Sequence, residues 1–164
     1  MCVLPRLLSL PRSAILSEND LRAGPLAHFC DSPTLKKSRR GHRLDKAPTT
    51  FVFALWYLFQ LHAHDRPHAV PLWRAWAIHH RAAGTAEHAL FRWTDDELEL
   101  LEEARVKEVA QRYRANVREL YDTLLVPLAG NFSSFFPPDE ISWADFQQAV
   151  AVTSAHTVEV DGVK

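Results

Sequence analysis

The chain has 164 residues, of which 47% are apolar and 24% are charged, a composition typical of one globular domain with one sizeable core. Its formal net charge of -1 and isoelectric point of about 6.8 predict no general attraction to nucleic acid or to anionic membranes. The chain has only two cysteines and no C-x-x-C pair, so neither a disulfide scaffold nor a thiolate zinc site is indicated, and a reducing compartment is favoured.

The first of three expected parts, residues 1–47, should be largely irregular. Its apolar pieces between positions 3 and 10 are punctuated by prolines, which favours edge strands or extended segments over helix. Ser17 then offers a cap for a short helix, and the Gly24-Pro25 pair would end it. We expect a strand remnant followed by one short helix.

Basic residues are concentrated in this first part, which carries nine Lys or Arg against four acids. The run 36–43 has no hydrophobic periodicity and no interleaved aromatic residue, so a solvated loop is favoured over a contact with phosphates. Residues 1–16 contain two arginines, several leucines and no acid, a weak targeting signal that prolines 5 and 11 interrupt. We expect an intracellular protein, cytoplasmic or nuclear, with a plastid as the alternative.

The second part, residues 48–155, should be helical. Thr49 or Thr50 can cap a helix whose apolar positions from 51 to 61 surround much of its circumference, so this helix should be buried. The run is about half the roughly 20 residues that a membrane-spanning helix needs. Behind Pro71, Trp73 and Trp76 begin an apolar stripe that predicts a second, short helix.

A capping box, Thr94 with Glu97, predicts the start of a further helix. Downstream, apolar residues recur at steps of three and four, which predicts one long amphipathic helix over roughly 104–125. Its stripe consists of Val106, Val109, Ala110, Tyr113, Val117, Leu120, Tyr121 and Leu124.

Prolines and a glycine between positions 127 and 138 fence an expected loop that contains Phe132, Phe135 and Phe136. Ser142 then caps a helix that runs to about residue 151. The third part, residues 156–164, has β-branched residues and an Asp-Gly turn dipeptide, which predicts the start of a β-hairpin that the chain does not complete. The expected fold class is mainly α, with short β remnants at both ends.

Six of the nine histidines fall between positions 62 and 88, but their spacing does not predict a metal site. On a helix, His62 and His64 point about 200 degrees apart, whereas ligands need i,i+4 placement. His64, Asp65 and His68 lack the turn or paired nucleophile of a catalytic site. No phosphate loop or dinucleotide fingerprint occurs. We expect the five tryptophans to pack in the core and not to cage a cation.

Several segments, in order, resemble the helical insertion in the SET domain of Rubisco-methyltransferase-like protein methyltransferases. Residues 7–17 resemble the strand and turn after the first SET strands, and residues 55–76 resemble a pair of the family's helices. Residues 91–101, the long helix, residues 135–138 and Trp143-Ala144-Asp145-Phe146 follow in the family's order. The resemblance implies a helical SET-insertion bundle within a protein-lysine N-methyltransferase that uses S-adenosyl-L-methionine and acts on a protein substrate.

By position, Thr153 and Ser154 fall at the family's substrate cleft, which makes them the expected substrate-binding residues. In place of the family's arginine stands Ser154, whose hydroxyl cannot replace a guanidinium fork. The family's cofactor segment, Asn-His motif and catalytic tyrosine region have no counterpart here, so we expect no catalytic, cofactor-binding or metal-ligating residue and little catalysis by this chain alone. The alternative is a non-enzymatic helical protein-binding module that uses Phe132, Phe135, Phe136 and exposed tryptophans.

Overall fold

In a computed structural model, residues 16–24, 26–30, 47–62, 70–84 and 87–157 are described. These residues form helices joined by short loops, and none of them lies in a strand. The mainly α fold class is therefore confirmed. The strands expected near residues 3–10, the basic run 36–43 and the hairpin expected near the end of the chain lie outside the described residues.

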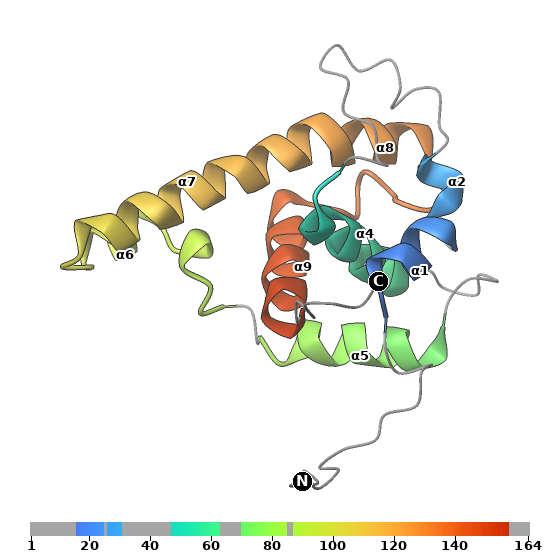
Figure 1. The fold of residues 1–164 in the computed structure, drawn as a ribbon, viewed down its shortest axis with the longest axis horizontal. Coiled ribbons are helices and arrows are strands. Elements are labelled where there is room, and N and C mark those ends of the chain that lie inside the picture. Colours follow the sequence, from blue (N-terminus) through green and yellow to red (C-terminus); the bar gives the residue numbers. More distant parts are fainter. Residues whose placement is uncertain (1–15, 25, 31–46, 63–69, 85–86, 158–164) are drawn as a thin grey trace, which may run out of the picture.

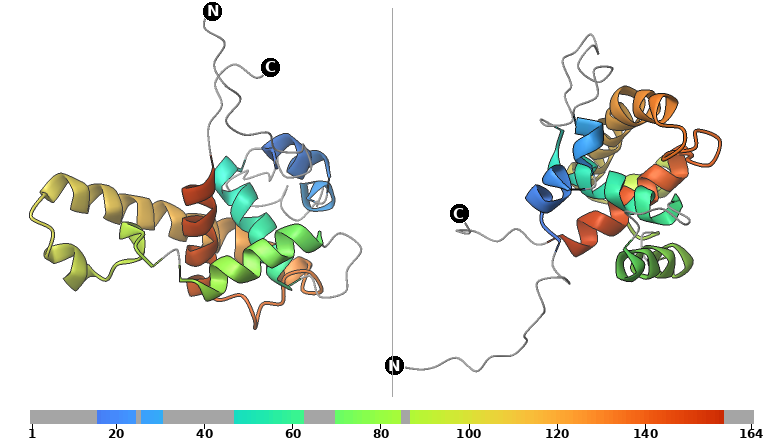
Figure 2. Two further views of the ribbon diagram at one scale, coloured as in Figure 1. Left: turned by 90° about the horizontal axis from the view of Figure 1, so that it is seen from below. Right: turned by 90° about the vertical axis from the view of Figure 1, so that its right-hand side faces the viewer.

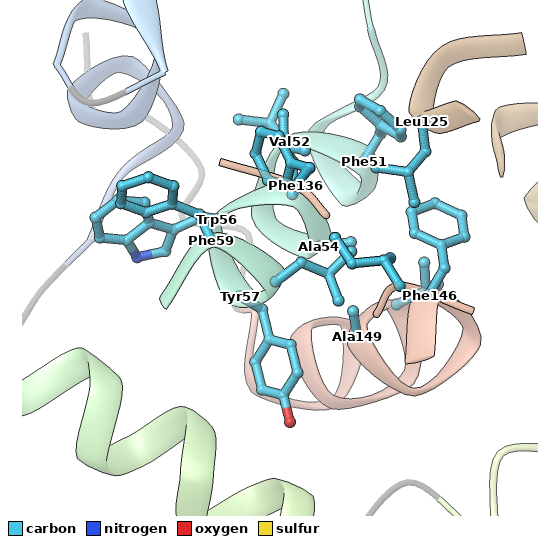
Figure 3. Close-up of a cluster of buried hydrophobic side chains, with 14 of the residues drawn as sticks. Phe51, Val52, Ala54, Trp56, Tyr57, Phe59, Leu125, Phe136, Phe146 and Ala149 are labelled. Atoms are coloured by element: carbon cyan, nitrogen blue, oxygen red, sulfur yellow. The ribbon is translucent and has the colours of Figure 1, made fainter. Parts of the chain in front are cut away.

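Two crossing helices, α4 (Thr49–His62) and α9 (Trp143–His156), form the centre of the molecule (Figure 1). As expected from its apolar circumference, α4 is buried almost along its whole length. Figure 3 shows Phe51 of α4 facing Phe146 of α9, and their ring centroids lie 5.9 Å apart. Ala54 and Ala149 are fully buried, and such small side chains let the two helices approach closely.

The short helix α5 (Pro71–Ala82) packs on one side of this pair (Figure 1). Pro71 occupies its first turn, where no intrahelical amide bond is lost, so the expected proline start is confirmed. Ala77 is buried against the core, and its carbonyl accepts a hydrogen bond from the Tyr57 hydroxyl at 3.1 Å. Burial raises the pKa of Tyr57 to about 12, which keeps this hydroxyl a donor.

The N-terminal helix α1 (Glu18–Ala23) packs beside α4, and the short helix α2 (Ala27–Cys30) packs beside α1. The predicted cap is confirmed, because the Ser17 hydroxyl accepts the Asp20 amide at 3.2 Å. The predicted end is also confirmed, because α1 stops at Ala23 and Gly24 is its C-cap. A Cβ on Gly24 would meet the Asp20 carbonyl oxygen at 2.6 Å, so this position suits glycine.

The predicted cap of α4 was wrong. Thr49 and Thr50 both lie within the first turn, and the Pro48 carbonyl accepts the first helical amides. The Thr49 hydroxyl donates to Glu18 at 2.6 Å instead. This threonine therefore ties α1 to α4 and does not cap the start of α4. Its partner lies 31 positions away, beyond the reach of a local capping rule.

A long helical segment runs through α7 (Ala104–Leu120), a π-helical turn η4 (Tyr121–Leu125) and α8 (Val126–Asn131). The long helix predicted over 104–125 is confirmed, but the loop predicted to begin at Pro127 was wrong, because the helix continues past it. In η4 the Val126 amide donates to the Tyr121 carbonyl, a widened turn just before Pro127. Such a turn relieves the clash and the lost hydrogen bond that a proline otherwise imposes.

The first half of α7 projects from the body together with the 3-10 turn η3 (Leu90–Arg92) and the short helix α6 (Asp95–Glu99) (Figures 1 and 2). We call this projection, residues 90–113, the arm. The Thr94–Glu97 capping box is confirmed at the start of α6. Its helix is only five residues long, and α7 begins after a break.

The core helix α9 begins with a second capping box, Ser142 with Asp145, which confirms the predicted start. The helix runs five residues further than predicted, to His156, so Thr153 and Ser154 lie in its last turns and His156 is helical. Burial on the core overrides the weak helix preference of the β-branched residues there, since Val152 is fully buried.

Candidate functional site

A groove of about 590 Å³ opens between the arm and the end of α9. Its lining is mostly apolar and comes from η3, the first half of α7 and one residue of α9. The main lining residues are Leu90, Phe91, Val106, Val109, Tyr113 and Ser154. Concave, largely apolar surfaces with a few polar groups are the usual form of a binding site.

One wall of the groove is held by Arg114 of α7. Its Nε donates to the Phe91 carbonyl at 3.0 Å, one terminal nitrogen donates to the Trp93 carbonyl, and the other pairs with Asp95 at 2.8 Å. A planar guanidinium suits such a set of acceptors because its donors point in fixed directions. Arg114 therefore fixes η3 and the start of α6 against α7.

The same wall of the groove is stabilised by the packing of two aromatic rings and by the capping box of α6. Phe91 meets Tyr113 edge to face, with centroids 5.0 Å apart. The Thr94 amide donates to the Glu97 carboxylate at 2.7 Å and the Thr94 hydroxyl does so at 3.0 Å. These bonds hold the pKa of Glu97 below its usual 4.5.

The two expected substrate-binding residues are placed differently. Thr153 is buried, and its hydroxyl donates to the Ala149 carbonyl at 2.7 Å within α9. Ser154 is exposed and lines the groove. The geometry thus presents Ser154, and not the Thr153 hydroxyl, to a bound molecule. Sequence reasoning placed Val106, Val109 and Tyr113 on an amphipathic stripe but did not connect this stripe with Ser154, because they meet only in the folded chain.

Histidines come together where α5 meets α9, a cluster that the sequence did not predict. The His80 ring lies 4.4 Å from that of His156 and 5.3 Å from that of His79, between centroids, and Trp76 packs on both His80 and His156. Burial lowers the pKa of His80 below its usual 6.5, and the neighbouring imidazoles His156 and His79 lower it further. Neutral histidine is the form that this contact favours.

A second pocket of about 450 Å³ lies near the His62 side chain, which is buried and meets Glu140 at 3.3 Å through Nδ1. The His64, Asp65 and His68 group considered from the sequence lies outside the described residues.

Among the residues that the structure describes, no group of three or more His, Cys, Asp or Glu side chains is placed to hold a metal ion. Within the same ranges, no helix combines the length and the apolar character needed to cross a membrane.

The three loop phenylalanines lie inward. Phe132, Phe135 and Phe136 meet Phe29 of α2 edge to face, with centroids 5.0 to 5.4 Å apart, and Phe136 is fully buried. Phe132 and Phe135 are half-buried, so these two rings leave only part of their surface to the partner that the binding-module alternative assigned to the three phenylalanines.

Four of the five tryptophans pack as expected. Trp56 stacks on Phe59 with centroids 5.5 Å apart, and Trp73, Trp76 and Trp143 pack against the buried core. Trp143 also lies under the Arg118 guanidinium, at 5.0 Å from the ring centroid. Four of the five rings therefore support the fold.

Two curated proteins are similar to this chain. The N-lysine methyltransferase SETD6 of Mus musculus is 28% identical to it over 153 residues, and the SETD6 of Rattus norvegicus is 27% identical over 153 residues. Each match covers 93% of this chain and 29% of the relative, so the chain spans less than a third of their length. No family model matches the chain, and no solved structure matches it. The similarity indicates a distant relationship to lysine methyltransferases.

Proposed function

We propose that this chain is the helical insertion of a SET-domain protein-lysine N-methyltransferase of the Rubisco-methyltransferase-like group, and that it contributes to holding the protein substrate. The observation that carries the proposal is the similarity to two lysine methyltransferases across 93% of the chain. The mainly helical fold supports it, because a catalytic SET core is built of strands whereas its insertion is helical.

S-adenosyl-L-methionine is the methyl donor that this function requires, and the described glycines do not fit the family's glycine-containing cofactor segment. Gly24 sits against its own helix and Gly84 has φ 61 in a turn beside Glu87, so neither offers open backbone to a ligand. Gly130 has open space around it but lies in α8, away from the groove lining. We therefore assign none of these glycines to the methyl donor.

Ser154 supports a substrate-binding role, because it is exposed at the groove and its hydroxyl can both donate and accept a hydrogen bond. Thr153 would act indirectly, by keeping the last turn of α9 helical through its bond to the Ala149 carbonyl. Neither residue can supply the fixed guanidinium fork of the family's arginine.

A non-enzymatic binding module is the second candidate function. The groove favours it, since an apolar groove with an exposed valine can bind a protein segment without any catalysis. In this form of the alternative, the partner surface is the arm and not Phe132, Phe135 and Phe136, which pack against Phe29.

Methyl transfer separates the two functions. We would read the native transcript through both ends, express its product and this 164-residue chain, and incubate each with radiolabelled S-adenosylmethionine and core histones. The proposal expects lysine labelling by the transcript's product and little by this chain alone. A folded transcript product that leaves histone lysine unlabelled and does not bind S-adenosylmethionine would favour the binding module.

A further inference from the structure

The apolar stripe of α7 is only partly covered in its first half. Ala110 and Val117 are almost fully buried, but Val109 on the same stripe remains 47% exposed. At the tip of the arm Leu100 is 82% exposed. A regular stripe of this kind normally lies against a partner surface, so a groove that leaves Val109 half exposed can gain apolar contacts by binding.

An acidic run borders the groove on the side of the arm. Residues 94–103, which form α6 and the break before α7, carry six acids and no base, and all six acids are exposed. Asp95 pairs with Arg114 and Glu99 pairs with Lys107, so part of this charge is balanced inside the arm. Glu103 and Arg105 both line the groove, and the whole arm carries seven acids against four bases.

This charge selects the kind of partner. A row of carboxylates repels phosphate groups, which argues against nucleic acid or an anionic lipid surface as the occupant. It attracts ammonium and guanidinium groups, while the apolar floor requires uncharged side chains between them. The complement is a basic segment with interspersed apolar residues.

We propose that the groove binds a lysine-rich protein segment, whose apolar side chains cover Val109 and Tyr113 and whose lysines face the acids of the arm. The Ser154 hydroxyl on the opposite wall would bond the backbone of this segment. The proposal deepens and rests on the proposed function, because a lysine methyltransferase acts on a protein segment that contains a lysine, and the acids of the arm would favour segments with further lysines beside it. The carboxylates add mainly encounter rate and specificity, and the apolar floor adds most of the affinity.

The probe is a fluorescein-labelled peptide that repeats Lys-Leu-Lys-Ser three times, followed by fluorescence anisotropy on the whole chain without S-adenosylmethionine. We expect saturable binding that weakens with added salt and that is lost when the lysines are replaced by glutamate. Val109→Ser should weaken binding about fivefold, the effect of removing roughly half a buried valine contact. Asp96→Asn combined with Glu103→Gln should weaken it further and reduce the salt dependence.

Matched controls lie elsewhere on the same molecule. Val126 is 49% exposed and lies on the same helical segment outside the groove lining, so Val126→Ser should leave binding unchanged. Asp139→Asn is the corresponding control for charge, since Asp139 is exposed and outside the lining. Circular dichroism checks that each variant keeps its helix content, which is expected because every substituted side chain is already exposed.

Two results would overturn the proposal: peptide affinity equal in Val109→Ser and Val126→Ser, or a chain that is dimeric by analytical ultracentrifugation and becomes monomeric only with Val109→Ser. The second result would make the groove an interface between copies of this chain. Because no methyl donor is present, a chain that binds the peptide but belongs to no active methyltransferase would refute the proposed function alone.

Discussion

Loss of the Arg114 guanidinium should release the wall of the groove while leaving the core folded. Arg114→Ala removes three hydrogen bonds and deprives the carbonyls of Phe91 and Trp93 of their donor. Hydrogen bonds to a charged group contribute about 1.5–3 kcal/mol each when shielded. The Asp95 carboxylate is 75% exposed, so its bond adds little, and the two carbonyl bonds together should contribute about 2–3 kcal/mol.

Native-state hydrogen exchange measures this local free energy. The amides of Arg92 and Trp93 bond within η3, and the amide of Leu98 bonds within α6. A local loss of about 2–3 kcal/mol should speed their exchange by about 30- to 150-fold. Arg112→Ala, at an exposed arginine on the same helix, should leave these rates unchanged. Exchange at η3 that changes less than about threefold, or that rises equally in α4, would refute the assignment of the wall to Arg114.

Two further predictions concern the core and the histidine cluster. Phe146→Ala should lower the free energy of unfolding by about 3–5 kcal/mol because its ring is fully buried. Phe53→Ala, at a half-buried ring on α4, should lower it clearly less. Urea titration measures both free energies, and equal losses would contradict the packing. Because the pKa of His80 is lowered in the fold, the unfolded chain binds more protons, so stability should fall as the pH drops below about 6.5. In His80→Gln, the melting temperature should depend less steeply on pH across this range. A slope equal to that of the unchanged chain would contradict this prediction.

Local signals accounted for what the sequence predicted well. The capping boxes at Thr94 and Ser142 need only residues three positions apart, so they are readable from the sequence. The buried α4 was predictable because its apolar residues leave no polar face. Failures came where a distant contact or an unusual backbone decided the outcome: Thr49 bonds to Glu18, and a π turn admits Pro127 into a helix.

The candidate site was harder to predict than the fold. Ser154 was singled out through its position in a family pattern, and the amphipathic stripe was visible by its period. That the stripe faces Ser154 depends on the angle of the arm, which Arg114 fixes through carbonyl oxygens of η3. Every residue type carries a backbone carbonyl, so no pattern of side chains could have indicated these hydrogen bonds of Arg114.

Helix α9 connects the core to the groove, and this placement allows the two roles to be separated. Phe146 and Val150 of this helix are fully buried, and Ser154, one turn later, lies at the surface of the groove. Because residues i and i+4 lie on the same face of a helix, Ser154 continues the line of Phe146 and Val150 past the edge of the core. The core therefore sets the position of Ser154 without covering it, and a substitution at its hydroxyl can change binding while the packing that orients it stays intact.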